Sequence, residues 1–140
     1  PRPVADSAPG RMPFGQGVAG YADLVELRVA SGKLFQGRCA AWFRLQRPLV
    51  DGEIPSPCQR VAVAADSGNG VSAVLDLARY SFVNSDLTIN LLRRPQGEWI
   101  CVDACTLLAP NGCGLAESRL FDEQGLIGRA TQSLAVRQRR

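Results

Sequence analysis

Small hydrogen-bonding side chains recur at every second position in one stretch of the sequence. The segment 80–93, "YSFVNSDLTINLLR", reads as a strand that places polar side chains on one face and apolar ones on the other. The polar positions are Asn84, Asp86, Thr88 and Asn90, and the apolar positions are Val83, Leu87, Ile89 and Leu91. Asn and Asp are poor strand formers, which indicates that hydrogen bonding determined this choice. A subunit interface or a polar substrate would satisfy such a face, and so would solvent around a half-buried strand.

Histidine is absent, and its absence excludes whole classes of catalysis. None of the 140 residues is His. A Ser-His-Asp or Cys-His nucleophile therefore cannot be built from this chain, and histidine acid–base chemistry is excluded with it. Any catalysis must use carboxylates, amides, hydroxyls and backbone dipoles.

The five cysteines do not form a recognisable metal or disulfide pattern. Their number is odd and no pair has the Cys-x-x-Cys spacing. A thiolate metal site would need further ligands, and histidine is not available to supply them. We therefore expect small buried side chains in a reducing cytosol, with no metal and no cofactor.

The composition is that of a soluble globular domain. The apolar fraction is 46% and the charged fraction 21%, and the net charge of +3 is mild. The basic residues are scattered rather than clustered with aromatics, which argues against a nucleic-acid partner. No stretch resembles a signal peptide or reaches membrane-spanning length, so the sequence predicts a cytoplasmic protein without a membrane partner.

The order of the predicted elements indicates the fold class. Residues 1–20 are rich in Pro, Gly and Ala and predict a linker or extended arm, and residues 21–140 form the domain. The predicted order is two strands, one helix and four strands: 22–32, 35–46, a helix over 56–70, then 80–93, 98–108, 114–121 and 126–137. Turn residues separate the last four strands, which predicts an antiparallel meander. The class is therefore α+β, an antiparallel sheet wrapped around one helix in the hot-dog arrangement.

Local signals define the one good helix. Ser56 can cap it and Pro57 occupies the first turn, where proline is tolerated. The apolar side is predicted to contain Val61, Ala62 and Ala65. Gly68 and Gly70 are predicted to end the helix, since glycine is common at helix C-termini.

Several motifs in this order resemble the C-terminal half of the double-hot-dog thioesterase-like family, of the acyl-CoA thioesterase II type. They are "AADSGNGVSAVLD" at the helix end, "NSDLT" on the next strand, the turns "RRPQGEW" and "DEQG", and "ATQ" on the last strand. The resemblance implies a hydrolase of acyl-CoA or another acyl thioester, with a role in lipid metabolism. It also implies pairing with a second hot-dog domain, either as a homodimer or with a separate half, because the family usually joins two halves in one chain.

The resemblance further implies a set of site residues. In the family an Asp at the helix end, a hydroxyl on the next strand and a Gln on the last strand orient the attacking water, and these positions fall on Asp66, Asn84 and Gln132. Asn84 departs from the pattern, since an amide can hold a water but has no hydroxyl. Thr88, further along the predicted strand, is a candidate to supply that hydroxyl.

Other interpretations of these residues stay open at this point. Asp66 could simply bond the glycine-rich turn, and Gln132 could be a buried amide satisfied by the fold. Arg93 and Arg94 could meet the phosphates of coenzyme A or lie in a solvated turn. The departure at Asn84 favours a second function, a non-catalytic acyl-binding or structural half. A hot-dog dehydratase uses His with a carboxylate, so the lack of His argues against it.

Overall fold

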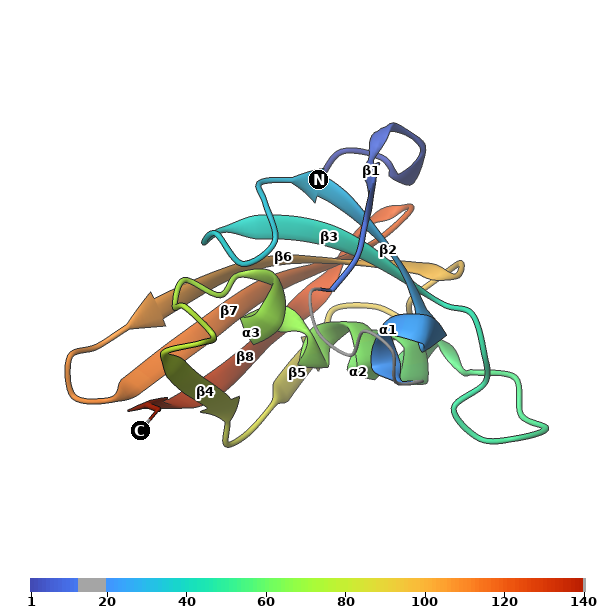
Figure 1. Cartoon of the computed structure of the whole chain (residues 1–140). Coiled ribbons are helices and arrows are strands. Elements are labelled where there is room, and N and C mark those ends of the chain that lie inside the picture. Colours follow the sequence, from blue (N-terminus) through green and yellow to red (C-terminus); the bar gives the residue numbers. More distant parts are fainter. Residues whose placement is uncertain (13–19, 140) are drawn as a thin grey trace.

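The computed structural model describes residues 1–12 and 20–139. Within these residues the chain forms an eight-stranded antiparallel sheet in the order β1-β2-β3-β6-β7-β8-β4, with β5 also paired to β8. The main helix and a short helical turn lie against one face of the curved sheet (Figure 1). This arrangement confirms the predicted α+β class and the hot-dog architecture.

The elements follow the predicted order, with three additions in the N-terminal third of the chain, a second short helix after the predicted one, and the predicted strand 80–93 divided in two. The helical elements are η1 (Val4–Asp6), α1 (Tyr21–Leu24), α2 (Pro57–Asp66) and α3 (Gly68–Val71). The strands are β1 (Ala8–Gly10), β2 (Val25–Ser31), β3 (Cys39–Leu45), β4 (Tyr80–Asn84), β5 (Thr88–Leu91), β6 (Trp99–Leu108), β7 (Cys113–Asp122) and β8 (Gly125–Gln138). The first predicted strand thus begins later than expected, because α1 takes its first residues. Among the described helices, none combines the length and hydropathy that crossing a membrane requires.

The N-terminal residues pack on the sheet. β1 pairs with β2, with Pro9 opposite Arg28. The indole Nε1 of Trp42 donates a hydrogen bond to the carbonyl of Arg2 at 2.8 Å. Val4 packs against the outer apolar cluster of the sheet, formed by Ala30, Ala40, Trp42, Trp99 and Cys101. Residues 13–19 of the predicted arm lie outside the described residues.

The start of α2 confirms the capping prediction. The Ser56 hydroxyl accepts from the backbone N–H of Gln59 at 3.2 Å, and the Gln59 side chain accepts from the Ser56 N–H at 2.6 Å. This reciprocal capping box satisfies two of the N–H groups that a helix start leaves unpaired. The predicted apolar side was partly wrong, because Ala62 is exposed while Ala64 is buried beside Val61.

The prediction that Gly68 ends the helix was also wrong in the role it gave to this glycine. α2 ends at Asp66, and Gly68 begins α3. A Cβ on Gly68 would lie 2.8 Å from the Ser118 Oγ and 3.0 Å from the Gln132 Oε1. Glycine is therefore required here so that the turn can lie close to the sheet, and not to end the helix.

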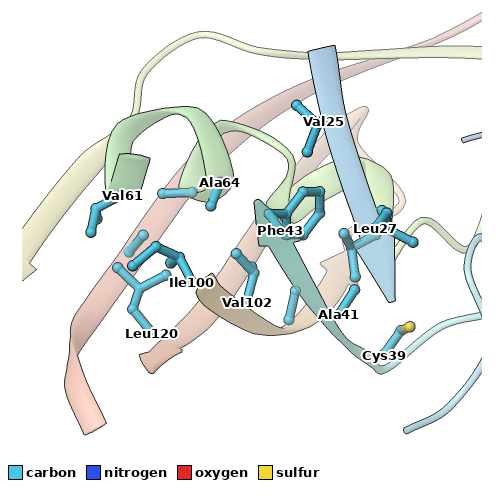
Figure 2. Close-up of a cluster of buried hydrophobic side chains, with 14 of the residues drawn as sticks. Val25, Leu27, Cys39, Ala41, Phe43, Val61, Ala64, Ile100, Val102 and Leu120 are labelled. Atoms are coloured by element: carbon cyan, nitrogen blue, oxygen red, sulfur yellow. The ribbon is translucent and has the colours of Figure 1, made fainter. Parts of the chain in front are cut away.

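The inner core is built between α2 and the concave face of the sheet. Val61 and Ala64 of α2 face Ile100 and Leu120 of the sheet, as Figure 2 shows. All four side chains are at most 1% exposed. Burial of this order typically contributes about 1.5–3 kcal/mol for each large apolar side chain.

The predicted strand 80–93 is interrupted, and this changes which residues face the core. Asn84 lies opposite Leu134, whereas Thr88 lies opposite Thr131, so the register shifts by one residue across positions 85–87. A one-residue shift reverses the faces of all later side chains. Val83, predicted to pack on the helix, is therefore 59% exposed.

Beyond the break, Leu87 and Ile89 pack against the inner core as predicted. Leu91 shares their predicted face but is 40% exposed near the end of β5. The apolar face predicted for 80–93 is thus confirmed only at its centre.

Candidate active site

The turn between α2 and α3 lies directly over β8, where Gln132 holds it. The Gln132 Nε2 donates to the main-chain carbonyl of Asp66 at 3.2 Å. The Oε1 accepts from the backbone N–H of Asn69 at 3.0 Å. The side chain points toward the helices because it shares the inner face of β8 with Ala130, and it is 1% exposed. The amide thus uses one of its two N–H groups and one of its two lone pairs on the main chain of the turn.

Asp66 is the last residue of α2, and its exposed carboxylate lies beside β4. The Asn84 Nδ2 donates to the Asp66 Oδ1 at 3.4 Å, a long hydrogen bond. The same Nδ2 lies 3.4 Å from the carbonyl oxygen of Asp86. The structure thus brings Asp66, Asn84 and Gln132 together on the inner side of the sheet.

Thr88 does not join this group. It opposes Thr131 on β8, and both side chains are exposed on the outer face of the sheet. The Asp86 carboxylate occupies the break between β4 and β5, where its Oδ1 accepts from the Ser133 N–H at 2.9 Å. That hydrogen bond lowers the pKa of Asp86. The polar alternation of 80–93 therefore serves two different faces and the break between them.

Tyr21, which the sequence did not single out, holds the same turn from the far side. Its hydroxyl lies 2.6 Å from the Ser67 Oγ and donates to the carbonyl of Val63 at 3.1 Å. Burial raises the pKa of Tyr21 despite the hydrogen bond to Ser67, and the charge of Asp66 raises it further. No local pattern in the sequence could have found this contact, since Tyr21 and Ser67 are 46 positions apart.

Neither the buried cysteines nor Arg93 contribute to this site. All five cysteines lie in the described part of the chain and are free thiols, but only Cys39 and Cys101 are buried as predicted, whereas Cys58 and Cys113 are exposed. Burial raises the pKa of Cys39 to about 11 and that of Cys101 to about 12, so both are protonated and unreactive at neutral pH. Arg93 forms a bidentate pair with the buried carboxylate of Asp122, with both N–O distances 2.6 Å. Arg93 therefore supports the fold between two turns rather than facing a coenzyme.

Solved structures with this architecture define its class. An acyl-CoA thioesterase II of Mycobacterium marinum has 20% identity and a TM-score of 0.61, and a proposed thioesterase of Novosphingobium aromaticivorans has 22% identity and a TM-score of 0.70. A conserved protein of Pseudomonas aeruginosa has 19% identity and a TM-score of 0.61. At these identities the likeness shows the fold, which is that of the hot-dog thioesterases.

The match to a protein family is more specific. The chain belongs to the family of acyl-CoA thioesterase C-terminal domains, whose model matches residues 2–136. No curated protein sequence matches the chain significantly. The structural alignment covers 93% of this chain but 56% of the Mycobacterium protein, and 96% of this chain but 51% of the Novosphingobium protein. For the Pseudomonas protein it covers 87% of this chain and 95% of that one. The chain therefore spans about half of the first two relatives.

Proposed function

We propose that this chain is the hydrolytic hot-dog domain of an acyl-CoA thioesterase. The observation that carries the proposal is the convergence of Asp66, Asn84 and Gln132 at the end of α2. Family membership supports the reaction class, and the lack of His leaves a carboxylate as the natural base.

In the proposed reaction a water lies between the Asp66 carboxylate and the amides of Asn84 and Gln132. Asp66 accepts a proton from the water while the water oxygen attacks the thioester carbonyl carbon. The carbonyl becomes an oxyanion, which amide N–H groups can stabilise if they are already in place. When the tetrahedral intermediate collapses, the carbon–sulfur bond breaks. The thiolate then takes the proton from Asp66, which leaves a free acid and a free thiol.

A second hot-dog domain is part of this proposal. β4 and β5 form one edge of the sheet, and no strand among the described residues pairs with their outer side. The exposed Val83 lies on this edge strand. Open strand edges and exposed apolar side chains are typical of surfaces that a partner covers. A homodimer, or a pairing with a separate half, would complete the sheet and enclose the acyl chain.

A non-catalytic acyl-binding domain is the second candidate. Two features favour it. Asn84 offers an amide at the position where the thioesterase family that the sequence resembles has a hydroxyl. Gln132 hydrogen-bonds the main chain of the turn between α2 and α3. Such a domain would bind acyl-CoA through the same face without releasing thiol.

Thiol release from a panel of acyl-CoAs separates the two candidates. Asp66→Asn and Gln132→Ala should each slow hydrolysis while the fold is retained, and loss of the base should cost ~10²–10⁴-fold. A fall in turnover with an unchanged KM would show that the lost interaction acts in the transition state. Asp51→Asn, an exposed carboxylate before α2, is the matched control and should have no effect. Binding of acyl-CoA without thiol release would replace the proposal with the acyl-binding alternative.

A further inference from the structure

A chain of hydrogen bonds runs from β6 to Gln132 through the α3 turn. The Ser72 Oγ, in a side chain with no exposure, donates to the carbonyl of Gly68 at 3.0 Å. The same Oγ lies 2.7 Å from the Oγ1 of Thr106 on β6. The Gln132 amide lies at the other end of the same turn.

The number of protons on each hydroxyl fixes which group donates in these hydrogen bonds. A serine hydroxyl carries one proton, and Ser72 gives it to the Gly68 carbonyl, which can only accept. The contact with Thr106 therefore has Thr106 as the donor and Ser72 as the acceptor. Each hydroxyl thus polarises the next one in the same direction.

One planar peptide unit links this chain to Gln132. The Gly68 carbonyl and the Asn69 N–H belong to the same peptide bond and point in opposite directions. Ser72 holds the carbonyl end with its Oγ at 3.0 Å and with its backbone N–H at 3.2 Å, and the N–H end donates to the Gln132 Oε1 at 3.0 Å. Fixing the carbonyl therefore fixes the direction of the N–H toward Gln132.

We propose that Thr106 and Ser72 are positioning residues that set the orientation of the Gln132 side-chain amide. With the Asn69 N–H pointing at Gln132, only the amide oxygen can face it, so the Nε2 is directed to the Asp66 carbonyl. A rotated amide would place its NH₂ against the Asn69 N–H and leave two donors facing each other. The orientation follows from these contacts alone, and its effect on turnover rests on the proposed function.

Two variants of Thr106 separate positioning from simple packing. Thr106→Val keeps the shape of the side chain and removes the donor, whereas Thr106→Ser keeps the donor and removes a methyl group. Thr131→Val, on the outer face of β8, is the control. Ser72→Ala removes the next hydroxyl in this series of hydrogen bonds. It serves as a second variant if Thr106→Val does not fold.

The readouts are the ¹⁵N resonances of the Gln132 side-chain amide, hydrogen exchange at the Asn69 N–H, and kcat with KM for acyl-CoA hydrolysis. We expect Thr106→Val to shift the Gln132 resonances, to speed Asn69 exchange about tenfold and to lower kcat about tenfold at unchanged KM. Thr106→Ser should restore all of these values, and Thr131→Val should leave them unchanged.

The inference is overturned if Thr106→Val and Ser72→Ala change the melting temperature while the Gln132 resonances and Asn69 exchange stay as in the wild type. It is also overturned if Thr106→Ser behaves like Thr106→Val. If the wild type hydrolyses no thioester, the proposed function fails, and the two spectroscopic readouts alone decide whether Thr106 and Ser72 orient the amide.

Discussion

The Gln132 Nε2 donates to the main-chain carbonyl of Asp66 at 3.2 Å, and not to the Asp66 carboxylate. The carboxylate is instead approached by Asn84. Among the described residues, no hydrogen bond reaches the Asp66 Oδ2. Gln132 therefore anchors the main chain at the end of α2, and one oxygen of the Asp66 carboxylate has no hydrogen-bond partner among the described residues.

Gly68 gives a test of how closely the turn must lie on the sheet. Gly68→Ala would add a Cβ 2.8 Å from the Ser118 Oγ and 3.0 Å from the Gln132 Oε1. We expect it to displace Gln132, to destabilise the fold by about 1–3 kcal/mol as overpacking does, and to reduce thioesterase activity. Denaturant unfolding and thiol release are the measurements.

Gly70→Ala is the matched control in the same helical turn, because nothing lies within 4 Å of its added Cβ. It should leave activity unchanged and stabilise the protein by about 0.4–1 kcal/mol, since alanine restricts the unfolded chain. Equal effects of the two substitutions would show that contact with Gln132 is not what requires glycine at position 68.

Asn84→Thr introduces the hydroxyl that the thioesterase family resembled by the sequence usually has at this position. Asn84 lies on the inner face beside Asp66, so a threonine there can offer its hydroxyl to the same water. We expect higher turnover of acyl-CoA with little change in KM. Asn90→Thr, on β5 opposite Arg129, makes the same change on the outer face and should have no effect. Unchanged turnover in Asn84→Thr would remove Asn84 from the proposed mechanism.

The contrast between Asn84 and Thr88 shows what the sequence could and could not predict. The helix cap at Ser56 and the meander of long strands depend on neighbouring residues, and both were predicted, although the return contact from Gln59 was not. The polar alternation continues unbroken from Asn84 to Asn90, so nothing in the sequence marks the shift of register between them. That shift depends on the pairing with β8, including the contact between Asp86 and Ser133, which are 47 positions apart.

The same limit applies to Arg93 and Gly68. The pair of Arg93 with Asp122 joins residues 29 positions apart, so the sequence alone suggested a solvated turn or a phosphate contact. Gly68 follows a helix and resembles a stop signal, but the residues that require glycine there lie on β7 and β8. Tertiary contacts, which local patterns do not encode, determine both positions.

Asp122 should make a large, pH-dependent contribution to stability. Burial raises the pKa of its carboxyl, but hydrogen bonds from Arg93 and from the N–H groups of Gln96 and Gln124 outweigh this and lower it overall. A lowered folded-state pKa stabilises the fold above the unfolded carboxyl pKa of about 3.9. This stability is lost as the pH falls below that value toward the folded pKa.

Asp122→Asn should therefore reduce the free energy of unfolding by about 3 kcal/mol at neutral pH, because it leaves the Arg93 charge without its partner. The difference from the wild type should shrink as the pH falls below about 4. Glu123→Gln, the exposed neighbour, is the control for charge alone. Urea unfolding at several pH values measures the difference, and one that is constant across this range would contradict the assignment.

The open edge at β4 predicts assembly. We expect light scattering at micromolar concentration to show a homodimer, or a complex when a second hot-dog half is supplied. Val83→Lys places a charge on the edge strand and should weaken the association, because charged edge strands resist pairing. Ile54→Lys makes the same change at an exposed apolar side chain in the loop before α2 and should not. A stable monomer that neither dimerises nor binds a second hot-dog half would count against a sheet that continues across two domains.

In the proposed mechanism a water oriented by Asp66 attacks the thioester directly. This step can be followed in a single turnover of acyl-CoA in ¹⁸O-labelled water, with mass spectrometry of the acid product and of the protein. We expect one labelled oxygen to enter the acid, no label in the Asp66 carboxylate, and almost no product from Asp66→Asn over the same time. Label in the Asp66 side chain would show attack by the carboxylate itself. An undiminished yield from Asp66→Asn would show that another group activates the water, and either result would rule out the proposed role of Asp66.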